Sequence, residues 1–244
     1  MSFRRTPESR VICSLQIDWA PVFTGATMKF ELLSGVEKKS GKRLSLNQIQ
    51  EEKGMELKGS KTEKNLLAAF AGESQARNRY AFFASAAKKE GYEQISFIFL
   101  ETAENEKEHA KLFFNLLKGG DEEIMAAYPA GVVGNTADNL KAAAAGENFE
   151  WTKLYQEFAS IAKTEGLGEA YEAFSQVAEV EKFREARYLG LLKNVKEGKA
   201  FKKDASVKWH CRNCGYVFEG KEVPERCPVC KHPRAYFEVL AENY

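Results

Sequence analysis

The chain repeats part of itself, and this repeat restricts the possible fold more than any other feature. Ala71-Gly72-Glu73 is matched by Ala145-Gly146-Glu147, and segment 85–91 (SAAKKEG) is matched by segment 160–166 (SIAKTEG). Farther along, seven residues recur at a constant shift of 75: Phe99, Ala103, Glu104, Glu106, Lys107, Leu116 and Leu117 become Phe174, Ala178, Glu179, Glu181, Lys182, Leu191 and Leu192. Duplicated segments bury equivalent faces, so we expect two similar halves that pack against each other.

The region that contains the repeat is predicted to be helical. From Lys58 to Asp204 it is rich in Ala, Leu, Glu, Lys and Phe, with only Pro129 to interrupt it, and apolar residues recur at helical spacing. Glycines divide it into four predicted helices with two short connections and one long crossover. These helices are expected at residues 62–90, 96–117, 136–165 and 169–197. Four helices with one long connection predict an all-α ferritin-like four-helix bundle.

The repeat also places carboxylates among apolar residues. Glu106 precedes His109 by three positions, which puts both side chains on one helix face. Burying several carboxylates together costs many kcal/mol through desolvation and repulsion unless cations neutralise them. A pair of divalent metal ions would do so. The candidate metal ligands of the bundle, which are also its candidate catalytic residues, are Glu73, Glu106, His109, Glu147, Glu150 and Glu181.

One position departs from the usual ligand pattern. Di-iron carboxylate bundles take one Glu from each of two helices and Glu-x-x-His from each of the other two. The repeat places Arg184 where the first half has His109, and a guanidinium has no lone pair to give to a metal. The second metal site is therefore expected to be completed by water, weakly held or empty. Arg184 either pairs with Glu147 or Glu181, or replaces the second iron.

A plainer interpretation is that these glutamates are solvated charges on amphipathic helices, as is usual for an isolated Glu-x-x-His. It does not explain why they recur at repeat-related positions beside Ala and Phe. We assign to the surface the acids Glu101, Glu108, Glu122 and Glu123, and to the core the aromatic residues Phe70, Phe82, Phe83, Phe97 and Phe99. Tyr80 and Tyr155 lie within two helical turns of Glu73 and Glu150 and are candidates to hydrogen-bond into the site.

Four of the five cysteines form two Cys-x-x-Cys pairs near the end of the chain. Cys211 and Cys214 are separated by twelve residues from Cys227 and Cys230. Four thiolates define a tetrahedral site that suits Zn(II) or a single iron ion, and the spacing alone favours structural zinc at least as much. Residues 205–244 are therefore predicted to form a small metal knuckle, with aromatic residues packed around it. Cys13 has no evident partner.

Charge and hydropathy exclude several classes of function. The chain has 36 basic and 35 acidic residues, so no net field attracts nucleic acid or an anionic membrane. Its most apolar early segment, 11–23, is interrupted by Gln16, Asp18 and Pro21, so no membrane anchor is expected. Paired thiolates that bind metal are typical of a reducing compartment, which predicts a cytoplasmic location.

Residues 1–54 lack sustained periodicity and are predicted to form no packed structure of their own, next to a bundle at 55–204. Glu51-Glu52-Lys53-Gly54 has purine-rich codons, as a ribosome-binding site does. We therefore interpret Met55 as the native start and the preceding residues as translated leader. A regulatory or targeting arm is the alternative, and mass spectrometry of the natural amino terminus distinguishes the two.

Taken together, the motifs resemble those of rubrerythrins. The resemblance rests on segment 71–80 (AGESQARNRY), the Glu106-x-x-His109 motif, segment 209–216 (WHCRNCGY) and segment 227–230 (CPVC), and it covers residues 55–244. It implies a rubredoxin-type iron in the knuckle, with zinc as a possible substitute, and reduction of hydrogen peroxide at a di-iron centre. It also implies that Glu106 and Glu181 bridge the irons. Glu73, with Glu150 or His109, would hold the first iron, and Glu147 would serve the second.

The resemblance implies partners as well. Electrons would come from an NAD(P)H-linked reductase or a small rubredoxin, and would pass through the knuckle iron of the other subunit in a head-to-tail homodimer. The expected activity is that of an NADH peroxidase in oxidative stress defence. Three alternatives stay open: an electron carrier that uses only the knuckle, an iron store that uses the bundle, and a structural or regulatory zinc protein.

Overall fold

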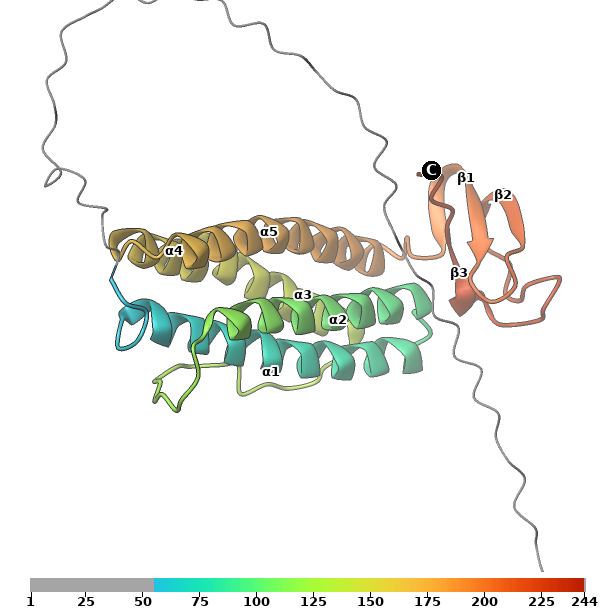
Figure 1. The fold of residues 1–244 in the computed structure, drawn as a ribbon. Coiled ribbons are helices and arrows are strands. Elements are labelled where there is room, and N and C mark those ends of the chain that lie inside the picture. The colour runs from blue at the N-terminus through green and yellow to red at the C-terminus, as the bar shows by residue number, and fades with distance from the viewer. Residues whose placement is uncertain (1–54, 244) are drawn as a thin grey trace, which may run out of the picture. The chain divides into compact units, whose positions relative to one another are not determined.

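The computed structural model describes residues 55–243, so the interpretations of residues 1–54 and of Cys13 lie outside the described residues. The ferritin-like bundle is confirmed, and Figure 1 shows its helices side by side. They are α1 (Lys61–Lys89), α2 (Glu93–Leu116), α3 (Thr136–Phe149), α4 (Tyr155–Thr164) and α5 (Gly168–Lys196). None of the helices in the described range is long and apolar enough to cross a membrane.

The third predicted helix contains an irregularity. Between α3 and α4 the chain makes a π-helical turn, η1 (Glu150–Leu154). The two helices and this turn therefore form one continuous helix without a loop. A π turn accommodates one extra residue within an α-helix. The repeat shows where that residue enters, because Glu73 and Glu147 are 74 positions apart whereas Tyr80 and Tyr155 are 75 apart. The second half therefore carries an inserted residue at this turn, where it displays Glu150.

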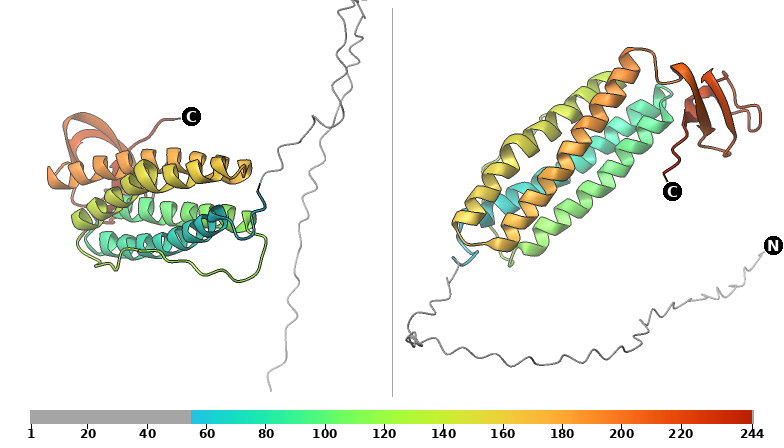
Figure 2. Two further views of the ribbon diagram at one scale, coloured as in Figure 1. Left: turned by 90° about the vertical axis from the view of Figure 1, so that its left-hand side faces the viewer. Right: turned by 90° about the horizontal axis from the view of Figure 1, so that it is seen from above.

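The long crossover between α2 and α3 runs along the outside of α1 (Figure 2). The Tyr128 hydroxyl donates a hydrogen bond to the Ala68 carbonyl at 2.7 Å. A Cβ atom at Gly72 would lie 3.5 Å from the Tyr128 ring, so a larger side chain there would disturb this contact. The crossover is thus held against the helix that carries Glu73.

The two halves cap each other's helices. The Glu165 carboxylate, at the end of α4, accepts hydrogen bonds from the backbone amides of Lys61 and Thr62 at 3.1 and 3.0 Å. Its repeat equivalent, Glu90 at the end of α1, accepts from the Thr136 amide at 3.1 Å. The first amides of a helix have no partner within the helix, and a carboxylate both satisfies them and opposes the positive end of the helix dipole. These reciprocal caps fix α1 to α4 and α3 to α1.

Replacing Glu165 with alanine is expected to lower the free energy of unfolding of the metal-free protein by about 1 kcal/mol, the usual cost of losing a helix cap. This corresponds to a fall in Tm of roughly 2 to 4 °C for a chain of this size. Thermal unfolding followed by circular dichroism measures the change. Exposed Glu157 lies on the same helix, and Glu157→Ala is the control. Equal Tm values for the two variants would show that the cap contributes nothing.

The core follows the predicted faces with two exceptions. Phe83 and Phe99 are buried, but Phe82 is 55% exposed and Phe97 48% exposed, so placing these two in the core was wrong. Successive helical residues are about 100° apart, so neighbouring phenylalanines cannot all face one side of a helix. The guanidinium of Arg212 instead lies over the ring of Phe97, with its Cζ atom 4.3 Å from the centroid of that ring.

The end of the chain forms a small antiparallel sheet of β1 (Lys202–Cys211), β2 (Val217–Glu222) and β3 (Phe237–Val239), in the order β2-β1-β3. Trp209 pairs with Phe218 on one side and Val239 on the other. Its buried indole donates a hydrogen bond to the Gly220 carbonyl at 2.9 Å. Because β1 begins at Lys202, the predicted boundary between residues 204 and 205 falls inside a strand.

Candidate metal centres

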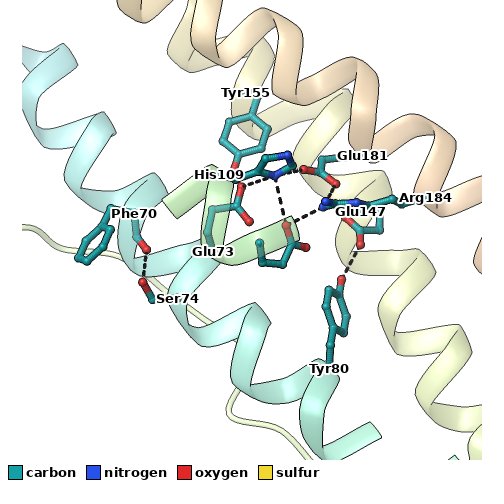
Figure 3. Close-up of polar contacts among 10 residues, drawn as sticks. Phe70, Glu73, Ser74, Tyr80, His109, Glu147, Tyr155, Glu181 and Arg184 are labelled. Atoms are coloured by element: carbon teal, nitrogen blue, oxygen red, sulfur yellow. Dashed lines mark hydrogen bonds and ion pairs between the residues drawn. The ribbon is translucent and has the colours of Figure 1, made fainter. Parts of the chain in front are cut away.

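The first donor group joins three helices of the bundle. Glu73 from α1, Glu106 and His109 from α2, and Glu181 from α5 place one donor atom each within 4.8 Å of one another. Figure 3 shows the side chains of Glu73, His109 and Glu181 turned toward one another. His109 Nδ1 lies 3.0 Å from Glu181 Oε1, 3.2 Å from Glu106 Oε2 and 3.6 Å from Glu73 Oε1. The three carboxylates are fully buried. The structure thus brings these four predicted residues together around one point.

A second donor group consists of carboxylates alone. Glu147 from α3, Glu150 from the π turn and Glu181 place donor oxygens within 4.8 Å of one another. Glu147 is fully buried, whereas Glu150 is only partly buried. All six residues predicted in the bundle therefore gather in two adjacent groups that share Glu181, the arrangement of a candidate di-iron carboxylate site.

Two buried tyrosines donate hydrogen bonds into these groups, as the sequence suggested. Tyr80 donates to Glu147 Oε1 at 2.6 Å, and Tyr155 donates to Glu73 Oε1. Each tyrosine thus holds a glutamate of the other half of the repeat. A carboxylate held by a fixed donor presents its second oxygen in a defined direction.

Arg184 enters the cluster from α5 with its side chain only 8% exposed. Its Nη1 atom donates hydrogen bonds to Glu106 Oε2 and Glu181 Oε2, both at 2.6 Å. The sequence offered Glu147 or Glu181 as a partner of Arg184. The structure shows the pairing with Glu181, together with a second pairing, with Glu106, that the sequence analysis did not name. The sequence did not identify Glu106 as a partner because that pairing joins α5 to α2.

Several buried carboxylate oxygens have no hydrogen-bond donor among the described residues. They are Glu73 Oε2, Glu106 Oε1, Glu147 Oε2 and Glu181 Oε1. Buried polar atoms without a partner are rare because their desolvation is uncompensated, and a bound cation would satisfy them. The first group, with three carboxylates and an imidazole, fits a divalent ion such as Fe(II). The second group offers no nitrogen donor.

The charge states of the metal-free site follow from its burial. Desolvation and the neighbouring charge of Glu106 raise the pKa of Glu73 to about 8. Burial lowers the pKa of His109, but the carboxylates of Glu106, Glu181 and Glu73 outweigh it and raise that pKa to about 11. Both groups therefore carry a proton at pH 7 in the absence of metal.

Because a metal ligand must be deprotonated, binding to the first group is expected to release about two protons per ion at pH 7. Affinity then rises steeply with pH up to the pKa of Glu73, about 8, and less steeply from there to the pKa of His109, about 11. Calorimetry in buffers of different ionisation enthalpy measures the release in protein whose knuckle is already loaded with metal. Binding that is independent of pH between 6 and 8 would contradict these charge states.

The four cysteines of the small domain form a third group, with all sulfur atoms within 4.8 Å of one another. Cys211 Sγ lies 3.8 Å from Cys230 Sγ, and Cys214 Sγ lies 3.6 Å from Cys227 Sγ. A tetrahedral ion with metal–sulfur bonds of about 2.3 Å separates its sulfurs by about 3.8 Å, so the spacing fits. Cys211 and Cys227 are buried, and Cys214 is exposed.

The two turns of the knuckle are alike. The residue after each Cys-x-x-Cys pair has a positive φ, 78° at Gly215 and 61° at Lys231. The Gly215 amide donates to the Cys211 carbonyl at 2.8 Å, and the Lys231 amide donates to the Cys227 carbonyl at 3.0 Å. Both turns therefore present their two thiols toward one point.

Comparisons with known proteins agree with this geometry. The family model described as rubrerythrin matches residues 64–192, and the model for the rubrerythrin rubredoxin-like domain matches residues 209–238. A rubrerythrin of Porphyromonas gingivalis is 59% identical over 79% of this chain and 96% of its own length. A rubrerythrin of Nitratidesulfovibrio vulgaris is 55% identical over 77% of this chain and 98% of its own. A solved structure of nigerythrin in a mixed-valence state has a TM-score of 0.50 at 30% identity, and covers 77% of this chain and 92% of that one.

Proposed function

The chain belongs to the rubrerythrin family, and from that premise we propose that it reduces hydrogen peroxide to water. One observation carries the proposal: a single chain holds a buried carboxylate and imidazole cluster and, separately, a four-thiol knuckle. Thiolate sites of this type suit one-electron transfer, whereas carboxylate sites with nitrogen donors suit reactions with oxygen species. The two sites together fit a peroxide-reducing oxidoreductase.

We assign the metal ligands of the first group as Glu73, Glu106, His109 and Glu181. Glu147 and Glu150 belong to the second group, which shares Glu181 with the first. Iron bound in the bundle would supply electrons to peroxide, whose reduction to two waters takes two electrons and two protons. The chain's own groups orient the ligands and hold protons nearby. Burial and the charge of Glu181 raise the pKa of Glu147 well above its usual value, which favours the protonated form of this carboxyl group in the absence of metal.

Peroxide reaches the site, in this proposal, through a cavity of about 780 Å³ beside α1 and the crossover. Gly72, Gln75, Arg79 and Tyr128 line it, and Glu150 lies in its wall. Glu150 is thus the only member of the two bundle donor groups, among the described residues, that also lines this cavity. A small polar molecule would meet its carboxylate first.

Electrons enter, in this proposal, at the knuckle, where exposed Cys214 offers a short route from the surface. The donor would be an NAD(P)H-linked reductase or a small rubredoxin, and a head-to-tail homodimer would bring the knuckle of one subunit to the bundle of the other. We further propose a cytoplasmic role in defence against oxidative stress. In this proposal the helical bundle reduces peroxide, and the small four-cysteine domain that begins with β1 at Lys202 accepts the electrons.

Anaerobic steady-state turnover tests the function. Iron-loaded protein is supplied with NADH, a reductase and a rubredoxin, and the loss of peroxide and of NADH is followed. We expect one NADH oxidised per peroxide consumed, at a rate proportional to the concentration of this protein. A rate that does not depend on the protein would favour an electron carrier, and uptake of many irons per chain without turnover would favour an iron store.

A further inference from the structure

The geometry points to a bundle that binds one metal ion, with the guanidinium of Arg184 in the place of the second. This inference rests on the proposed function only in requiring that the bundle binds metal. Di-iron bundles have a Glu-x-x-His motif, and so a nitrogen donor, for each of the two metal ions. This chain departs from that pattern at Arg184, which stands where the second histidine is expected.

The first observation is the equivalence of Arg184 and His109. The two residues are related by the repeat, at the shift of 75, and they approach the same two carboxylates. His109 Nδ1 lies 3.2 Å from Glu106 and 3.0 Å from Glu181, and Arg184 Nη1 lies 2.6 Å from each (Figure 3). Arg184 therefore has, toward the second donor group, the position that His109 has in the first donor group.

The second observation is the length of these contacts. A nitrogen ligand and a carboxylate oxygen on one ion are each about 2.0 to 2.2 Å from it, with the ion between them. Arg184 Nη1 instead donates directly to Glu106 Oε2 and Glu181 Oε2. The nitrogen has no lone pair, and it occupies the space between the two carboxylates that an ion bridged by them would need. One oxygen of Glu106 and one oxygen of Glu181 thus already accept hydrogen bonds from Arg184.

The third observation is the rest of the second group. Glu147 Oε1 accepts the Tyr80 hydroxyl at 2.6 Å, and Glu150 is only partly buried. Without Arg184 as a nitrogen ligand, the second group offers carboxylates only, and one of them, Glu181, is shared with the first group. Arg184 is always charged, so it compensates part of the buried negative charge without a metal.

Metal stoichiometry tests the inference without any assay of turnover. The full-length protein is loaded anaerobically with Fe(II), freed of excess metal, and its iron is measured per chain by mass spectrometry. We expect about two irons per chain, one in the knuckle and one in the bundle. After oxidation, the integrated paramagnetic resonance signal should account for two isolated ferric ions per chain, one in the knuckle and one in the bundle. About three irons per chain, with a spin-coupled pair in the bundle and a signal that accounts for the knuckle ion alone, would overturn the inference.

Arg184→His restores the second Glu-x-x-His and is expected to raise the iron content to about three per chain, with the integrated signal of isolated ferric ions falling from two per chain to the one of the knuckle. Arg187→His changes an exposed arginine on the same helix, which pairs with Glu101, and should leave the content at about two. The count in the unmodified protein decides the inference even if Arg184→His fails to fold. Two irons without peroxide turnover would refute the proposed function alone, and three irons with turnover would refute this inference alone.

Discussion

Replacing Glu181 with glutamine is expected to empty the bundle of metal and to lower peroxide reduction by at least about 100-fold. Glu181 belongs to both bundle donor groups, and its two oxygens face different neighbours. Oε1 lies 3.0 Å from His109 Nδ1, and Oε2 accepts a hydrogen bond from Arg184. Glutamine keeps the size of the side chain but removes its charge, so the loss reports on ligation and not on packing. Iron content per chain and peroxide turnover measure the effect.

Glu179→Gln is the matched control, because Glu179 lies two residues away on α5 and pairs with Lys182 at the surface. It should keep full metal content and activity. In Glu181→Gln the thiolate-to-iron absorption of the knuckle should also remain, since the four cysteines form a separate group. A variant that retained bundle iron and turnover would remove Glu181 from the site.

The second large effect is expected in the knuckle. Cys227→Ser should abolish the thiolate-to-iron absorption and lower turnover with a rubredoxin donor by roughly 100-fold, because a hard hydroxyl replaces a buried thiolate ligand. Cys227 also belongs to the small apolar core around Trp209 and Phe237. Small metal domains owe much of their folding free energy to the metal, so residues 202–243 should lose amide protection from hydrogen exchange.

The helices of the bundle should keep their protection in Cys227→Ser, because their core consists of residues from α1 to α5. Cys13→Ser is the control, since Cys13 belongs to neither Cys-x-x-Cys pair. It should leave the absorption unchanged. An unchanged absorption in Cys227→Ser, or its loss in Cys13→Ser, would show that the knuckle is not the four-thiolate site.

The repeat made much of this arrangement predictable. It placed Glu73, Glu106, Glu147 and Glu181 at equivalent positions, and the structure brings them to one cluster. The cysteine spacing was equally informative, because two short turns with paired thiols have few ways to face each other. Local signals of this kind depend on neighbouring residues along the chain, so they can be read without knowing the packing.

The π turn was missed although the sequence contained its signal. The shift between the halves changes from 74 to 75 between Glu73 and Tyr80, which requires one extra residue in the second half. A single helix was predicted there because helix propensity does not register an insertion. The role of Glu150 depends on this turn, since the inserted residue has no equivalent in the first half.

Other features depended on the packing of distant elements. The sequence indicated that Arg184 could pair within the cluster, but its contact with Glu106 joins residues 78 positions apart. The exposure of Phe82 and Phe97 likewise depends on which face each helix turns inward. Such contacts are set by the relative rotation of the helices, which the pattern of apolar residues fixes only approximately.

Peroxide reduction with electrons from the knuckle is tested most directly by a single turnover. Fully reduced, iron-loaded protein is mixed anaerobically with one equivalent of hydrogen peroxide in a stopped-flow instrument. We predict that the knuckle iron reoxidises at the rate at which peroxide disappears, and that both processes are lost in Glu181→Gln. Peroxide loss while the knuckle stays reduced, or knuckle oxidation that persists unchanged in Glu181→Gln, would contradict this account.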